Sequence, residues 1–159
     1  MKKITLLFAL TVFALGFTAC EKDDEEPEAP LSIKTQMLVN PSSWETAAIV
    51  LMDTETEEFY EIPEEFDLDC FNDNTLKFNK NGNFEASEGS DLCDDEEQTS
   101  TGTWKFNSSE TKITFTDEEG PDEVEILELT EEDFIIASGE TIPTEIGDLL
   151  IVIAFEAKE

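Results

Sequence analysis

Apolar and polar residues alternate along several short runs, and turn-forming residues separate these runs. The runs cover residues 44–52, 75–79, 84–86, 103–106, 112–116, 124–129, 134–137 and 149–155. Alternation with a period of two is typical of strands that bury one face. Asn81-Gly82 is a strong hairpin signal, and a change of phase at Leu127 predicts a β-bulge. Eight short strands with hairpin-length gaps predict an antiparallel meander.

The first and last runs predict that this meander closes on itself. Residues 47–52 of the first run and residues 149–155 of the last are apolar at nearly every position, whereas the middle runs alternate. The first and last strands of an up-and-down barrel are neighbours, and closure removes exposed sheet edges. We therefore expect an all-β fold, an antiparallel up-and-down eight-stranded barrel.

These two strands would also form an apolar patch on the outside of the barrel. Ile33, Met37 and Leu38 have the spacing of a short N-terminal helix that could cover this patch. Two alternatives stay open: the strands are buried in a sandwich, or the patch binds a partner.

The N-terminus has the pattern of a lipoprotein leader. Residues 1–19 contain two lysines, an apolar stretch that is too short to span a bilayer, and Ala19 directly before Cys20. The pattern predicts cleavage between Ala19 and Cys20 and attachment of lipid to the Cys20 thiol. The alternative is an ordinary secretory leader with a coincidental cysteine. Two or three acyl chains anchor stably, so we expect the membrane as the N-terminal partner.

Residues 20–31 form an acidic tether that contains proline, and residues 32–159 form the domain. Charge and proline keep such a tether extended. Lys22 followed by acidic residues also resembles the export signal of Bacteroidota lipoproteins that reach the cell surface. We expect a lipid-anchored outer-membrane protein on the cell surface; the alternative is one that faces the periplasm.

The charge of the chain excludes several functions. Asp and Glu number 40 against 9 basic residues, the net charge is −31, and there is no Arg and no His. This charge repels nucleic acid, which we exclude as a partner. The lack of His excludes Ser-His-Asp chemistry and His-ligated zinc, and we expect no cofactor. A carboxylate pair, as in glycoside hydrolysis, is the catalytic chemistry left open.

Cys70 and Cys93 are the cysteines that remain once Cys20 is acylated. A pair of cysteines in an exported domain favours a disulfide, which would bring together the acidic residues near each cysteine. Oxygen-rich loops suit Ca²⁺, but the spacing matches no calcium loop and charge runs are usually solvated, so we expect no metal. The Ca²⁺ candidates are Asp67, Asp69 and Asp73.

The inward positions of the predicted strands are mostly large and aromatic. They are Trp44, Leu76, Phe78, Phe84, Trp104, Phe106, Ile113, Phe115, Val124 and Phe134. A barrel of this size either fills with such side chains or holds one small apolar ligand. Both options stay open at this point.

The order of several motifs resembles the lipocalin-like domain of Bacteroidota lipoproteins. These motifs are Leu68-Asp69-Cys70, Thr75-Leu76-Lys77-Phe78, Asn81-Gly82-Asn83-Phe84, Cys93, Gly102-Thr103-Trp104 and Ile126-Leu127-Glu128-Leu129. The resemblance implies a calycin-type barrel with a Cys70–Cys93 bridge. It also implies that Trp44 closes the barrel floor, although Ser42 replaces the usual Gly and the chain has no Arg to pack on the indole.

These features favour a non-enzymatic, membrane-anchored binding or accessory domain that takes a small apolar ligand or a protein partner. The second hypothesis is an envelope structural or protein-interaction lipoprotein with a filled barrel. The third is a carboxylate-pair hydrolase.

Overall fold

A computed structural model describes residues 30–63, 69–92, 98–144 and 147–159. Residues Leu31–Glu159 form one compact unit. The predicted leader and residues 20–29 of the predicted tether lie outside the described residues. Among the residues that are described, no helix has the length and apolar character needed to cross a membrane.

Within the described residues, the secondary structure consists of one short helix, one 3-10 turn and a series of strands. The elements are α1 (Ile33–Val39), β1 (Ser43–Asp53), β2 (Phe59–Tyr60), η1 (Asp69–Phe71), β3 (Thr75–Phe78), β4 (Asn83–Ser87), β5 (Thr99–Phe106), β6 (Lys112–Thr116), β7 (Pro121–Leu129), β8 (Asp133–Thr144) and β9 (Gly147–Lys158).

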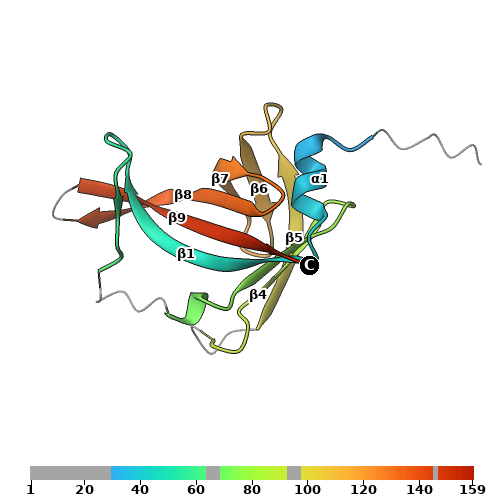
Figure 1. The fold of residues 1–159 in the computed structure, drawn as a ribbon, viewed down its shortest axis with the longest axis horizontal. Helices are drawn as coiled ribbons and strands as arrows, with labels where there is room; N and C mark the ends of the chain where they lie inside the picture. The colour runs from blue at the N-terminus through green and yellow to red at the C-terminus, as the bar shows by residue number, and fades with distance from the viewer. Residues whose placement is uncertain (1–29, 64–68, 93–97, 145–146) are drawn as a thin grey trace, which may run out of the picture. The chain divides into compact units, whose positions relative to one another are not determined.

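The strands form a closed antiparallel barrel (Figure 1). Strands β3 to β9 pair in chain order, and β1 pairs with β3 on one side and with β9 on the other. The predicted eight-stranded barrel is therefore confirmed, and the sandwich alternative is wrong. The sequence pattern did not predict β2, a strand of 2 residues beside the C-terminal half of β1.

Unequal strand lengths give the barrel two different ends. Strands β1, β8 and β9 have 11, 12 and 12 residues, whereas β3 and β4 have 4 and 5. We call the end that carries α1 the helix end; it also carries the turns at 79–82, 107–111 and 130–132. We call the opposite end the hairpin end, because the long β8–β9 hairpin extends there (Figure 1, left). The turns at 54–58 and 117–120 also lie at the hairpin end.

Two glycines let the β3–β4–β5 wall form. Gly82 has a φ of +83°, a conformation that favours glycine, and its N–H donates to the Asn79 carbonyl at 3.0 Å. Gly102 lies where Phe84 packs against β5. A Cβ at Gly102 would overlap the Thr116 carbonyl oxygen and lie 2.6 Å from Cε1 of Phe84.

Two irregularities shape the long strands. The bulge predicted at Leu127 is confirmed, since the β7–β8 register shifts between Ile126 and Glu128. The second irregularity was not predicted. The sequence pattern ends one strand at Ala137, but β8 continues to Thr144 after a register shift between Ala137 and Thr141. Residues 138–140 therefore bulge instead of ending the strand.

The predicted N-terminal helix is confirmed, but its predicted place over the outer patch is wrong. Ser32 begins α1 by accepting a hydrogen bond from the Thr35 N–H at 3.0 Å. The helix contacts β3 and β7, and its buried residues Leu38 and Val39 join the cluster of side chains inside the barrel. The helix therefore closes one end of the barrel, where Leu38 and Val39 are buried among the core side chains.

Candidate functional site

The half of the barrel next to α1 is filled with aromatic side chains. The ring of Phe78 lies 5.5 Å from that of Trp104 and 5.8 Å from that of Phe134, both edge to face. Phe134 also stacks on Phe155 at 5.7 Å. Aromatic rings at these separations are in contact, so side chains occupy the centre of this half.

The structure places all ten predicted inward residues in or against this aromatic cluster. Seven are buried within it: Trp44, Phe78, Phe84, Trp104, Ile113, Val124 and Phe134. Three are partly buried against it: Leu76, Phe106 and Phe115. The sequence argument missed four other buried members: Leu38, Val39, Ile136 and Phe155.

Trp44 joins the helix end to the wall of the barrel. Its side chain is 0% exposed, and its Nε1 donates to the Leu38 carbonyl at 2.9 Å. Leu38 lies in the last turn of α1, where carbonyl groups have no helical partner. The ring of Phe134 lies 5.6 Å from the indole. Trp44 therefore stabilises the closed end of the barrel by packing and by a hydrogen bond.

The inner face of the hairpin end continues the apolar lining beyond the aromatic cluster. Alternate residues of a strand share a face, so Ile153, Ile151 and Leu149 of β9 point to the same side as Phe155. Their partners in the register are Ile49, Leu51 and, on β8, Ile136 and Ile142.

Burial differs among these hairpin-end side chains. Leu51 and Leu149 are each 1% exposed, whereas Ile49, Ile142 and Ile151 are only half-buried. The half-buried isoleucines give this part of the barrel an apolar surface that solvent reaches. Sequence reasoning missed it, because a run that is apolar at every position does not show which residues point inward.

Asp53 places a carboxylate beside this apolar surface. It follows Leu51 by two residues on β1 and pairs with Leu149, so it lies on the same face. The Thr56 and Glu55 N–H groups donate to its Oδ1 at 2.9 and 2.7 Å. These hydrogen bonds, with that from Thr56 the stronger influence, hold the pKa of Asp53 below its usual range. The carboxylate is therefore ionised at neutral pH.

The lysines of the domain lie at the helix end. Apart from Lys2, Lys3 and Lys22, the chain has Lys34, Lys77, Lys80, Lys105, Lys112 and Lys158, which lie on α1, on β3, in the turn after β3 or near the helix-end termini of β5, β6 and β9.

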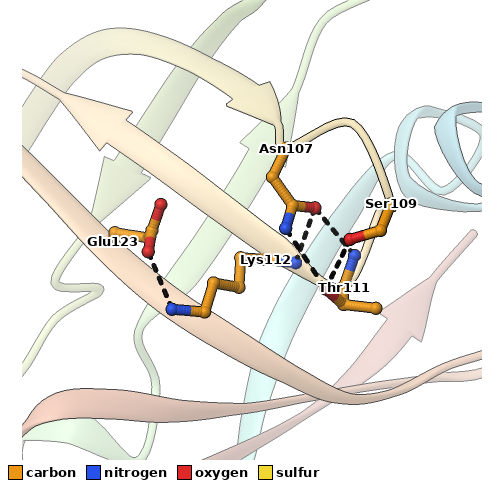
Figure 2. Close-up of polar contacts among 5 residues, drawn as sticks. All are labelled: Asn107, Ser109, Thr111, Lys112 and Glu123. Carbon is orange, nitrogen blue, oxygen red and sulfur yellow. Dashed lines mark hydrogen bonds and ion pairs between the residues drawn. The ribbon is translucent and has the colours of Figure 1, made fainter.

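Three of these lysines have partners at the helix end. Lys34 Nζ donates to the Glu110 carbonyl at 2.6 Å, and Lys158 Nζ lies 3.2 Å from the Glu45 carboxylate. Lys112 lies 2.9 Å from Glu123, beside the hydrogen-bonded turn that Asn107 organises, and this carboxylate raises the pKa of Lys112 (Figure 2). The basic residues of the domain are therefore gathered at the helix end.

The turns and loop segments described at the hairpin end carry acidic residues and no lysine. The acidic residues are Asp53, Glu55, Glu57, Glu58, Glu88, Asp91, Asp117, Glu118, Glu119 and Asp148. The helix end therefore carries both lysines and carboxylates, whereas the charged residues described at the hairpin end, around its apolar surface, are all acidic.

Comparison with known families matches this chain over most of the barrel. A sequence profile described as a lipocalin-like domain covers residues 42–136. The chain belongs to the lipocalin-like domain family. Searching the curated proteins gave no match for this lipocalin-like protein.

Two solved structures are similar to this lipocalin-like protein. One is a DUF4847 family protein from Bacteroides vulgatus, with 12% identity and a TM-score of 0.47 over 76% of this chain and 96% of that one. The other is bovine odorant binding protein in complex with a selenium-containing odorant, with 13% identity and a TM-score of 0.41 over 85% of this chain and 78% of that one.

In this lipocalin-like domain, one contact joins the segment after Cys70 to the segment before Cys93. Asp73 Oδ2 accepts hydrogen bonds from the Ser90 N–H at 2.6 Å and the Ser90 hydroxyl at 2.8 Å. These bonds, led by the one from the N–H, lower the pKa of Asp73. Asp73 therefore fastens the loop after β4 to the segment after η1.

The structure describes only some of the other predicted residues of this region. Cys93, Asp67 and the side chain of Asp69 lie outside what the structure describes, so the disulfide and the calcium candidates stay predictions. Within residues 30–63, 69–92, 98–144 and 147–159, no group of three or more His, Cys, Asp or Glu side chains could hold a metal ion.

Proposed function

We propose that this protein is a non-enzymatic, lipid-anchored binding domain whose barrel takes a small apolar molecule at the hairpin end. The observation that supports this is the half-buried, apolar inner face formed by Ile49, Ile142 and Ile151. Burying such a face beneath an apolar ligand is favourable, at about 25 cal/mol for each Å² removed from water.

The filled helix end supports the division of the barrel into a scaffold and a site. Close aromatic contacts and the Trp44–Leu38 hydrogen bond hold the helix-end half of the barrel in one arrangement. A rigid scaffold lowers the entropy that a binding site loses when its ligand arrives. The ligand therefore lies beyond the aromatic cluster and not within it.

A second candidate function, a protein-interaction lipoprotein, is favoured by the opposite face of the same strands. Val50, Met52 and Leu150 have apolar side chains on the outer face and are half-buried, and Val152 between them on that face is 2% exposed. Apolar residues that lie together on the outside of a barrel are typical of a surface that binds another protein. Cross-linking on intact cells would detect a stoichiometric partner if this candidate is right.

The anchoring part of the proposal rests on the leader and Cys20. Replacing Cys20 by Ala removes the thiol that accepts the lipid, and we expect the acyl groups and stable membrane attachment to be lost while the fold is kept. Mass spectrometry and membrane fractionation measure both. Acylated, membrane-bound Cys20→Ala protein would contradict the proposal. Protease treatment of intact cells separates display on the surface from attachment facing the periplasm.

The binding part is tested with N-phenyl-1-naphthylamine, a neutral apolar dye that becomes fluorescent in apolar surroundings. We expect saturable, one-site binding to the mature chain, which begins at residue 20 and here carries Cys20→Ala so that no lipid is attached. Ile151→Gln places a polar group on the inner face and should weaken binding about tenfold, the factor that corresponds to about 1.4 kcal/mol.

Leu150→Gln is the matched control for this test, because Leu150 is the half-buried neighbour on the other face of β9. We expect it to bind the dye like the unmodified chain, once circular dichroism shows that both variants are folded. Equal loss of binding in both variants, or no binding by the unmodified chain, would refute the proposed site.

A further inference from the structure

The segregation of charge between the two ends of the barrel bears on which ligand the proposed site accepts. All six lysines of the domain lie toward the helix end. The hairpin end has carboxylates on the turn after β1, on the turn between β6 and β7 and at the start of β9, and its described turns contain no lysine. Among the charged side chains that the structure describes at the hairpin end, an entering ligand therefore meets carboxylates and no lysine.

Asp53 brings this negative charge next to the apolar surface itself. It lies on the inner face of β1, opposite Leu149 and two residues from Leu51. Its bonds from the Glu55 and Thr56 N–H groups stabilise the ionised form. An anionic head group beside Asp53 would meet like charge with no basic residue to offset it.

We infer that the hairpin end binds positively charged amphiphiles, molecules with an apolar body and a cationic head group, and disfavours anionic ones such as fatty-acid carboxylates. This inference rests on the proposed binding function and names the class of ligand for the same site. The apolar body packs on the half-buried isoleucines, and the cationic head lies among the carboxylates at the rim. Charge complementarity of this kind determines specificity more than affinity.

Three probes with one alkyl chain and different head groups test the inference: octylammonium, octanol and octanoate. Isothermal titration of the mature chain in 10 mM salt should give the order octylammonium, octanol, octanoate from tightest to weakest. Several carboxylates at about 10 Å in a water-like dielectric give at least about a tenfold ratio between cation and anion. In 1 M salt the Debye length falls to about 3 Å and the ratio should approach one.

Two triple variants separate the rim from the general acidity of the chain. Each variant removes three exposed carboxylates; the first variant removes them at the hairpin end and the second at the helix end. The hairpin-end variant is Glu55→Gln, Glu118→Gln and Asp148→Asn; the helix-end variant is Glu128→Gln, Glu131→Gln and Asp133→Asn. We expect only the hairpin-end variant to lose most of the preference for octylammonium.

The outcomes distinguish this inference from the function on which it rests. Equal affinity for the three probes, or an equal effect of the two triple variants, would overturn the charge preference and leave apolar binding in place. Octylammonium binding that Ile151→Gln does not weaken would show adsorption to the acidic surface and also overturn the inference. Failure of all three probes to bind would refute the proposed function itself.

Discussion

Replacing Trp44 by Phe should destabilise the fold by about 2–5 kcal/mol. The helical partner of the Leu38 carbonyl would be the Ser42 N–H, but that group donates to the Lys158 carbonyl at 2.9 Å. The Trp44 indole supplies a partner for Leu38 instead, at 2.9 Å. A buried carbonyl left unpaired costs about 1–3 kcal/mol, and the space left by the smaller ring costs about 1–2 kcal/mol more.

Trp104→Phe is the matched control for this prediction. Trp104 is 8% exposed, and its Nε1 lies 3.1 Å from the Asn83 carbonyl and 3.3 Å from the Asn79 carbonyl. The Asn83 carbonyl also accepts from the Asn79 N–H at 2.8 Å, so it keeps a partner, and we expect a loss of only about 1–2 kcal/mol.

Urea unfolding of the mature chain, followed by far-ultraviolet circular dichroism, measures the free energy of unfolding of both tryptophan variants. A loss in Trp104→Phe that equals or exceeds the loss in Trp44→Phe would refute the reasoning. In that case the hydrogen bond to the end of α1 would not contribute what its burial implies.

Three further predictions concern the wall and the loops of the barrel. Gly102→Ala forces a Cβ into a neighbouring carbonyl and should destabilise the fold by about 2–3 kcal/mol. Gly120→Ala, at φ +124° with nothing within 4 Å of the new Cβ, should destabilise it by about 1 kcal/mol; equal losses in urea unfolding would contradict this. The stability lost in Asp73→Ala should be largest above the ordinary pKa of 3.8 and shrink as pH falls through the lower folded pKa; urea midpoints whose difference does not change with pH would rule this out. The Cys70–Cys93 bridge should leave both thiols unreactive to iodoacetamide and contribute about 3 kcal/mol that a reductant removes; two alkylated cysteines in unreduced, denatured protein would show that it does not form.

The strands of the barrel were predictable because most of them bury one face only. Leu76 and Phe78 alternate with polar residues, and so do Trp104 and Phe106, so period-two patterns gave both the strands and their inward side chains. The extra residue at Leu127 also changed the phase of the pattern, which gave the bulge in β7. Such features are local, and the sequence records them directly.

The extent of the hairpin end was not predictable from the same pattern. Ser138-Gly139 has the composition of a turn, yet β8 passes through it as a bulge and continues to Thr144, because β9 supplies pairing partners on both sides of the bulge. Strand β2 was missed for a related reason, since a strand of 2 residues exists only through its pairing with β1. Pairing between distant segments decided both features.

The candidate site was therefore found only in part from the sequence. The filled aromatic half follows from large residues at inward positions, but Ile49, Ile142 and Ile151 lie in strands where neighbouring positions are also apolar. Their inward face becomes evident from the register with Phe155 and Phe134. The sequence also shows the number of lysines without showing that the fold gathers them at the helix end.

Native mass spectrometry of the protein purified from its own host tests the central claim most directly. The account predicts that the unmodified chain and Leu150→Gln carry one reproducible small molecule, and that Ile151→Gln carries much less of it. Identification of the molecule by fragmentation then shows whether it has a cationic head group. An unmodified chain that is consistently empty, or a bound molecule that Ile151→Gln retains in full, would contradict the account.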